Sequence, residues 1–356
     1  MRKFIVGFAI AMIIPTIALL GFQRASSQPL LGILLNSSPP LPAGEVEQIL
    51  DLPDGDLPEG ITLDQRGNIF VGNRRASGGG IISEILKIEP DGSKSVLVTF
   101  GADFSPSDQN LLGLATDPTG NVYAAFQSSD PSWNGIWRVA EGESVTRLAG
   151  SQAISFPNAL AFDPRGNLYV TDSFSGSVWR FDNDGNVTQW MQHELLEPAQ
   201  DDPFGFPVPG ANGIAFYPPN QLYVANTEKG LLARIQIRVD GSPGQVDLIA
   251  AGPALLTMDG IAVDAQGDIY GVIPGYALLG TNPLVKIDPD SGEVVPVVTN
   301  AEEMAKFDVP LSIAFGRGAR DQKSVFITNG DLPVVEGGPG PGVVQTGVGA
   351  PGFPGK

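Results

Sequence analysis

The sequence predicts an all-β fold, a β-propeller of six four-stranded blades. Three observations support it: a phrase that returns six times, a second hairpin after most of the copies, and a strand ahead of the first copy that has no partner. The chain of 356 residues also contains 45 glycines and 31 prolines, a composition typical of short strands and tight turns. No window beyond the N-terminal stretch shows a long apolar period of 3.6 residues, so long amphipathic helices are not expected.

The repeated phrase joins a short apolar run to a second run through a turn of the type Asp-x-x-Gly-Asn. PNALAFDPRGNLYV, which starts at Pro157, is the clearest copy. The second residues of the six copies are 59, 112, 158, 212, 259 and 311, at spacings of 53, 46, 54, 47 and 52. A period near 50 with β patterning indicates propeller blades.

Each phrase holds two strands. The first is a short apolar run suited to an inner strand packed between blades, and the second alternates as a half-buried strand does. A second hairpin such as VWRFDNDGNVTQWM then completes four strands. The sixth copy has two strands, residues 341–348 can supply a third, and the outermost is missing. We therefore expect residues 45–52 to close the ring by pairing into the last blade, which removes an exposed edge.

The N-terminal residues predict export. Arg2 and Lys3 precede an apolar run at 4–22, and small residues follow at 25–27. This pattern predicts a signal peptide at 1–27 that is either cleaved or kept as a membrane anchor. A Pro-rich linker at 28–44, the propeller at 45–348 and a flexible Gly/Pro tail at 349–356 would follow, with the globular part periplasmic or extracellular.

Composition excludes several classes of function. The formal net charge is −18, from 39 acidic and 21 basic residues, so a nucleic-acid partner is not expected. The absence of cysteine rules out a disulfide framework, a thiolate zinc site and a cysteine nucleophile. His193 is the only histidine, and no nucleophile elbow, phosphate loop or H-E-x-x-H motif is present.

The first residues of the six inner strands should surround one mouth of the central channel. They are Glu59, Leu112, Asn158, Asn212, Asp259 and Leu311. Two carboxylates brought together there would raise each other's pKa unless a cation lies between them. We call these six equivalent positions the column. Carboxylate and amide oxygens are ligands that calcium accepts, so the column predicts a calcium site. The alternative is that Glu-Gly, Asn-Gly and Asp-Gly before a strand are ordinary turn chemistry.

The phrases PEGITLD, PNALAFD, ANGIAF and MDGIAVD resemble the inner-strand motifs of the regucalcin/gluconolactonase family. That family is related to paraoxonases, strictosidine-synthase-like proteins and NHL-repeat propellers. The resemblance covers about 45–348, and it implies that Glu59, Asn158, Asn212 and Asp259 hold a catalytic divalent metal. Family members that act on sugar lactones place an arginine two residues before the first ligand asparagine, where this chain has Phe156. Paraoxonases use a pair of histidines, which a single histidine cannot supply.

The resulting expectation is an exported calcium-dependent hydrolase of the gluconolactonase type that acts on a small lactone or ester. Asp259 would be both a metal ligand and the general base, although it could equally be a structural ligand alone. The loops at the same mouth would shape the substrate pocket. Their candidate substrate contacts are Asn73, Arg74, Trp133 and Tyr276. Asp172 is a further candidate, because it lies near the end of the following strand, where the resemblance implies an acidic substrate contact, although not at the matching place. Two alternatives remain: a non-catalytic NHL-like binding module with a structural metal, and a strictosidine-synthase-like protein.

Overall fold

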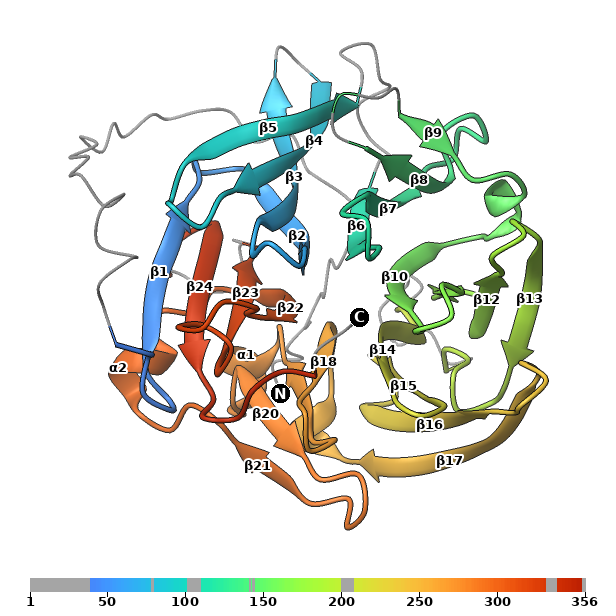
Figure 1. The fold of residues 1–356 in the computed structure, drawn as a ribbon. Helices are drawn as coiled ribbons and strands as arrows, with labels where there is room; N and C mark the ends of the chain where they lie inside the picture. The colour runs from blue at the N-terminus through green and yellow to red at the C-terminus, as the bar shows by residue number, and fades with distance from the viewer. Residues whose placement is uncertain are drawn as a thin grey trace, which may run out of the picture.

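The computed structural model describes residues 39–77, 80–100, 110–140, 142, 145–199, 208–330 and 338–353. Within these residues, 24 strands form six four-stranded antiparallel sheets, arranged as blades around a central channel (Figure 1). The predicted six-bladed propeller is therefore confirmed.

Each blade is given from its innermost to its outermost strand. Blade one comprises β2 (Leu57–Leu63), β3 (Ile69–Ser77), β4 (Gly80–Ile88) and β5 (Lys94–Phe100). Blade two comprises β6 (Asn110–Thr116), β7 (Val122–Gln127), β8 (Gly135–Val139) and β9 (Thr146–Arg147). Blade three comprises β10 (Pro157–Phe162), β11 (Leu168–Asp172), β12 (Ser177–Phe181) and β13 (Val187–Gln192).

The second half of the ring follows the same order. Blade four comprises β14 (Ala211–Tyr217), β15 (Gln221–Asn226), β16 (Leu231–Ile237) and β17 (Pro243–Ala251). Blade five comprises β18 (Ile261–Val263), β19 (Ile269–Val272), β20 (Leu284–Ile287) and β21 (Val294–Pro296). Blade six comprises β22 (Pro310–Phe315), β23 (Ser324–Asn329), β24 (Gly342–Gly347) and β1 (Val46–Asp51). Two short helices, α1 (Tyr276–Leu279) and α2 (Ala301–Met304), lie in connections between strands.

The N-terminal strand closes the ring as expected. β1 pairs antiparallel with β24, and Val46 lies opposite Thr346. The beginning of the strand is also clamped by residues that follow blade five: Glu303 accepts from the Val46 backbone N–H at 2.6 Å, and Lys306 donates to the Val46 carbonyl at 2.7 Å. β1 thus becomes the outermost strand of the last blade and covers the outer edge of β24.

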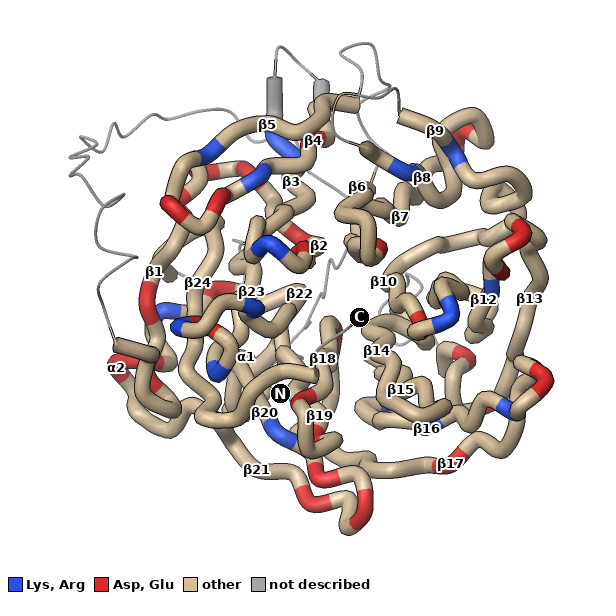
Figure 2. The backbone as a smooth tube through the Cα atoms, in the orientation of Figure 1, with Lys and Arg blue, Asp and Glu red and all other residues tan. Residues whose placement is uncertain are grey.

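The hydrophobic core is divided between neighbouring blades. Tyr169 and Val178 of blade three pack in one cluster with Leu222 and Ile235 of blade four. All four side chains are almost completely buried. Because each blade contributes to the cores on both of its sides, the ring holds its inner strands in a fixed relative arrangement. Acidic residues are spread around the ring in every blade (Figure 2).

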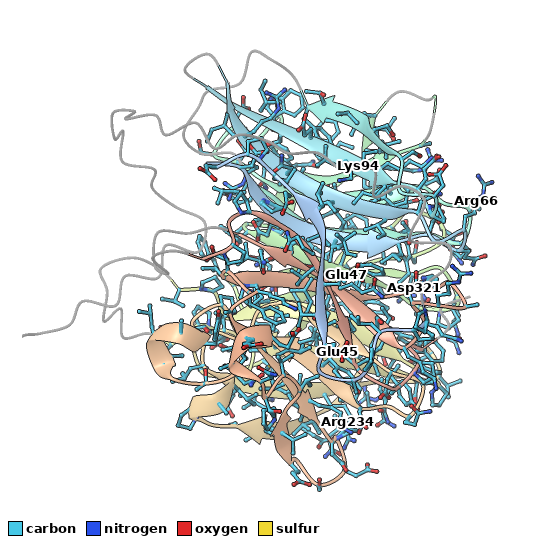
Figure 3. The ribbon with its side chains drawn as sticks, turned by 90° about the vertical axis from the view of Figure 1, so that its left-hand side faces the viewer. Glu45, Glu47, Arg66, Lys94, Arg234 and Asp321 are labelled. Carbon is cyan, nitrogen blue, oxygen red and sulfur yellow. The ribbon has the colours of Figure 1, made fainter. Side chains whose placement is uncertain are left out.

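The repeated Asp-x-x-Gly-Asn turn joins the first two strands of a blade. In blade one, the Asp64 carboxylate accepts from the backbone N–H groups of Arg66 and Asn68, each at 2.9 Å. Gly67 has a φ of +83°, which explains the glycine at this position. Arg66 and Asp321, which lie in the β2–β3 and β22–β23 connections, are on the same side of the disc (Figure 3). These turns surround the mouth of the channel opposite to the column of Glu59.

The two chain ends differ in what the structure describes. The expected export signal lies outside the described residues, and among those that are described no helix has the length and apolarity to cross a membrane. Part of the tail that we expected to be flexible is bound to the ring. Pro351 accepts from the backbone of Ala265 at 2.9 Å, and Phe353 donates to the Val263 carbonyl at 3.1 Å. Residues 354–356 lie outside the described part.

Candidate functional site

The predicted ligand column lies at irregularities in the inner strands. In blade one the register with β3 shifts between Pro58 and Ile61, so Glu59 and Gly60 fall outside regular pairing. Blades two, three, four and six have the same shift at the corresponding place. Bulges of this kind change the direction of a side chain and are frequent beside functional sites.

A glycine follows four of the six column positions. It allows the inner strands of neighbouring blades to approach each other closely. Gly60, Gly113, Gly213 and Gly260 all have φ outside the left-handed region. A Cβ on Gly60 would lie 2.2 Å from the Leu112 carbonyl oxygen, and one on Gly213 would lie 2.2 Å from that of Asp259. Adjacent inner strands therefore approach too closely for a side chain. The alternative that these pairs are turn chemistry does not hold for these glycines.

The four oxygen-bearing side chains of the column are buried at the end of the channel where the inner strands begin, which we call the hub. Their exposed fractions are 7% for Glu59, 6% for Asn158, 1% for Asn212 and 5% for Asp259. Burial and then the charge of Glu59 raise the pKa of Asp259, and the Asn212 side chain lowers it, so both residues lie near Asp259. Asn158 joins this group through Ser173, which binds both Asn158 and the carbonyl of Ala211, the residue before Asn212. The structure thus brings the four predicted ligands to one end of the channel.

Hydroxyl groups on the second strands orient both amides. Asn158 Nδ2 donates to Ser173 Oγ at 3.0 Å, and Ser173 donates to the Ala211 carbonyl of the next blade at 2.7 Å. Asn212 Nδ2 donates to Thr227 Oγ1 at 2.9 Å, and Thr227 donates to the Met258 carbonyl at 2.8 Å.

With one N–H of each amide committed in this way, the orientation of the amide is fixed and its oxygen can bind a ligand. No hydrogen bond to Asn158 Oδ1 or Asn212 Oδ1 is formed within the part of the chain that the structure describes. Sequence reasoning missed Ser173 and Thr227. Their signal was available, because a hydroxyl residue follows the second strand in both VTDS and VANT.

Two buried acids dominate the electrostatics of the site. Burial raises the pKa of Glu59 to about 7, and Arg74 partly offsets that rise. Arg74 Nη2 lies 3.9 Å from Glu59 Oε2. Burial, followed by the charge of Glu59, raises the pKa of Asp259 well above its usual range. Asp259 Oδ2 is buried and has no hydrogen-bond partner among the described residues, which is costly unless something else binds it.

These residues fit a hard divalent cation. Two carboxylates and two amide oxygens match the ligands that calcium takes, and water or substrate can complete the coordination. The described residues contain no group of three or more His, Cys, Asp or Glu side chains that could hold a metal. The candidate cage therefore depends on its two amides, and its donor set does not suit zinc.

The five predicted substrate contacts have different surroundings. Arg74 lies beside Glu59 and donates to Asn110, which is itself bonded to Gln127. Asn73 is fully buried, and its amide donates to Asp56 at 2.8 Å. Of these two residues, only Arg74 reaches the column.

The other three predicted contacts are engaged in packing or loop structure. Trp133 stacks on Trp137 with a centroid separation of 5.2 Å. The Asp172 carboxylate accepts from Ser155 N and Oγ and from Phe156 N, at 2.9, 2.7 and 3.0 Å, and so fixes the approach to Asn158. Tyr276 donates its hydroxyl to the carbonyl of Phe307 at 2.9 Å.

Phe156 occupies the position where sugar-lactone enzymes of the resembled family have arginine. Its ring is 2% exposed and packs against Phe174 at a centroid distance of 4.3 Å. The aromatic pair therefore offers no cationic group at this position. His193 lies in the connection after β13, where its Nδ1 accepts from the backbone of Leu195.

The fold and hub define a six-bladed β-propeller with a buried oxygen-lined site at one mouth of its channel. No known protein-family profile and no curated protein matches the chain. Its structural neighbours among solved structures include gluconolactonase, regucalcin and luciferin-regenerating enzyme propellers.

Three of these neighbours illustrate the likeness. Regucalcin from Agrobacterium tumefaciens, described as a calcium-binding protein, has a TM-score of 0.59 at 17% identity, covering 88% of this chain and 96% of that one. A gluconolactonase from Xanthomonas campestris has a TM-score of 0.57 at 18% identity, covering 89% and 95%. A luciferin-regenerating enzyme has a TM-score of 0.58 at 15% identity, covering 87% and 97%. At these identities the likeness establishes the shared fold.

Proposed function

We propose that this protein is an exported, calcium-dependent hydrolase that acts on a small lactone or ester at the hub of the propeller. The observation that carries the proposal is a buried oxygen of Asp259 that has no hydrogen-bond partner among the described residues. It lies beside Glu59 and near two amides whose orientation is fixed by hydroxyl groups. A bound cation would compensate the cost of burying these two carboxylates. The gluconolactonases among the structural neighbours support the choice of substrate class.

The residues divide the work as follows. A divalent cation held here would polarise the substrate carbonyl and stabilise the charge that develops on its oxygen. Glu59 supplies a charged ligand, and Asn158 and Asn212 present neutral oxygens held by Ser173 and Thr227. Asp259 would take a proton from the water molecule that attacks the carbonyl carbon.

The presence of Phe156 at this position favours a substrate other than a sugar lactone. The buried aromatic pair of Phe156 and Phe174 offers no charge or hydrogen bond to a polyhydroxylated ring. A lactone or ester with an apolar body would bury its surface at less cost. We therefore expect such substrates to react faster than gluconolactone.

The test is hydrolysis of a panel of lactones and aryl esters, with added calcium and after EDTA treatment. We expect EDTA to abolish turnover and calcium to restore it, and Asp259→Asn to lower kcat/KM by about 10²–10⁴-fold, as for loss of a general base. Glu59→Gln should weaken calcium binding in metal analysis of the purified protein. Activity that ignores EDTA and survives Asp259→Asn would contradict the proposal.

Phe156 also favours a second candidate, a non-enzymatic propeller whose ion braces the channel. On this hypothesis chelation lowers the thermal unfolding temperature, yet no member of the panel is turned over. The thermal and kinetic measurements on one sample separate the two candidates.

Export is proposed from the apolar run at 4–22 and the small residues after it. Expression of the full chain in a bacterium should place the folded protein outside the cytoplasm. N-terminal sequencing then shows cleavage near residue 27, whereas retention of the intact N-terminus in the membrane fraction shows an anchor. Recovery in the cytosol alone would contradict export.

A further inference from the structure

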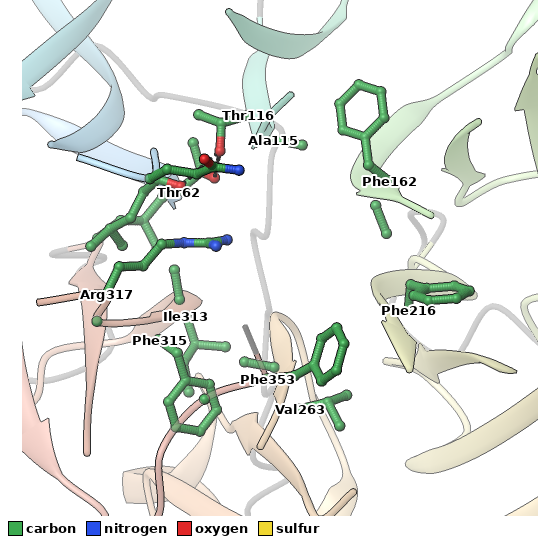
Figure 4. A pocket seen from close by; sticks show the side chains of 18 of the residues that line it. Thr62, Ala115, Thr116, Phe162, Phe216, Val263, Ile313, Phe315, Arg317 and Phe353 are labelled. Atoms are coloured by element: carbon green, nitrogen blue, oxygen red, sulfur yellow. Dashed lines mark hydrogen bonds between the residues drawn. The ribbon is translucent and has the colours of Figure 1, made fainter. Parts of the chain in front are cut away.

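A cavity of about 600 Å³ occupies the other mouth of the channel, within the size range of small-molecule sites. It is lined by the far ends of the inner strands, by the turns that follow them and by the C-terminal segment (Figure 4). None of the four candidate metal ligands is among its lining residues. In blade one the lining begins at Ile61 and continues to Gln65, whereas Glu59 lies nearer the start of β2.

Aromatic rings form much of the wall. Phe162 belongs to blade three, Phe216 to blade four, Phe315 to blade six and Phe353 to the C-terminal segment, and all four are only partly buried. Three of them are held by edge-on contacts with tyrosines: Phe162 with Tyr123 at 5.0 Å, Phe315 with Tyr270 at 5.4 Å and Phe353 with Tyr217 at 5.9 Å. The cavity is thus lined by fixed apolar surfaces that remain accessible to a ligand.

The cationic side chain of Arg317 enters this aromatic cavity. Arg317 extends into the opening from the blade-six side, next to Thr62 and Thr116, and Phe162 and Phe216 lie across from it (Figure 4). The backbone on either side of Arg317 is anchored, because Gly316 donates to the carbonyl of Ser324 and Gly318 donates to the Asp321 carboxylate. The guanidinium is therefore presented from a fixed turn.

Two acids of this mouth are hydrogen-bonded within their own hairpin turns. Asp64, whose charge acts on Arg317, accepts from two backbone N–H groups and from the Asn68 amide at 2.6 Å. Asp163 accepts from the equivalent donors, Arg165 N, Asn167 N and Asn167 Nδ2. The carboxylates of Asp64 and Asp163 are thus held in hairpin turns, while the Arg317 side chain extends into the opening (Figure 4). The Arg317 guanidinium is the cationic group in the opening that an anionic ligand would contact.

We propose that this second mouth binds a small organic anion with an apolar, ring-bearing body. The acid group would bind the Arg317 guanidinium and the hydroxyl of Thr62, and the rings would pack against Phe162, Phe216 and Phe353. Guanidinium and carboxylate groups pair in a bidentate geometry, which fixes the orientation of the bound ligand. The proposal is independent of the hydrolase site, because it uses different residues at the opposite mouth.

The test is isothermal titration calorimetry with 2-naphthoate and with 2-naphthylmethanol, which has the same ring system without the charge. We expect the acid to bind at least about tenfold more tightly, as a charge-assisted hydrogen bond provides. Arg317→Gln should remove that difference. Arg320→Gln, three positions further on and outside the lining, is the matched control and should leave it unchanged.

Further variants distinguish the contribution of the Arg317 charge to ligand affinity from that of the aromatic lining, and test that the candidate metal site plays no part. Phe353→Ala should lower the affinities for the acid and for the alcohol by the same factor, because it removes a contact with the ring system and leaves the charge in place. Glu59→Gln should change neither affinity. If Arg317→Gln does not fold, the proposal is tested with Arg317→Lys and with the ratio of the wild-type affinities for the acid and the alcohol. Equal affinity for the two probes, or absence of binding by either up to millimolar concentration, would overturn the proposal.

Discussion

The guanidinium of Arg74 lies 3.9 Å from the carboxylate of Glu59, and both side chains are largely buried. A cation therefore already faces the hub where the candidate cage is most negative. Burial lowers the pKa of Arg74 and raises that of Glu59, and each charge partly offsets the shift of the other. Arg74 thus provides part of the positive charge that a bound metal would supply, so the two should compete.

Replacing Arg74 with glutamine should tighten calcium binding. The variant removes a cation about 4 Å from a ligand, where two charges interact by up to about 4 kcal/mol at an effective dielectric constant of 20. Solvent and the flexibility of the side chain reduce this effect, and we expect a gain of about tenfold in calorimetric affinity. Arg75→Gln is the control, because Arg75 pairs with Glu84 at 3.3 Å instead. Weaker binding by Arg74→Gln would show that Arg74 positions Glu59.

The stability of the metal-free protein should fall as pH rises. The pKa of Glu59 rises from its ordinary value of 4.5 to about 7 on folding, so the folded state holds this proton more tightly than the unfolded state. Its stabilising contribution is complete below pH 4.5 and is lost as pH passes through 7. The shift corresponds to a free energy on the order of 3 kcal/mol.

Urea unfolding in EDTA at pH 5 and at pH 8 checks this dependence. Glu59→Gln should flatten it, and the raised pKa of Asp259 acts in the same direction. Calcium should add more stability at pH 8 than at pH 5, because the ion has fewer protons to displace. A Glu59→Gln variant with the slope of the wild type would show that other carboxylates control the pH dependence.

The hydroxyls behind the amides should matter for metal affinity. Ser173→Ala and Thr227→Val each remove the acceptor that fixes an asparagine amide. Because residues that orient metal ligands typically affect affinity 10–100-fold, we expect about tenfold weaker calcium binding for each variant. Ser175→Ala, in the same turn as Ser173 but bonded to Ser177, should bind calcium normally. Equal affinities for all three variants would exclude this role.

Much of the architecture was predictable because its signals are local. Each blade repeats one inner-strand phrase and one turn, and aligning the copies placed Glu59, Asn158, Asn212 and Asp259 in one column. The closure by β1 followed from counting strands.

Contacts between segments far apart in the chain were not predictable. The approach of Arg74 to Glu59, the binding of Phe353 to blade five and the entry of Arg317 into the second mouth depend on tertiary geometry. No periodic pattern in the sequence encodes them. The same limit explains why Asn73, Trp133 and Tyr276, chosen for their loops, lie in buried or stacked contacts.

The close approach of the inner strands predicts that Gly213 cannot be replaced. A Cβ at this position would lie 2.2 Å from the carbonyl oxygen of Asp259, so Gly213→Ala must push blades four and five apart beside two of the candidate ligands. We expect a loss of about 3 kcal/mol in the free energy of unfolding, as for severe overpacking, and weaker calcium binding.

Gly120→Ala is the comparison, because it replaces a glycine where no clash arises and away from the hub. Gly120 has a φ of +90° and open space around its Cβ position, so its replacement should cost about 1–2 kcal/mol and leave calcium affinity unchanged. Urea denaturation and calcium titration of both variants provide the comparison. If Gly213→Ala proved no more harmful than Gly120→Ala, the inner strands could separate without penalty, and a rigid cage at the hub would lose its physical basis.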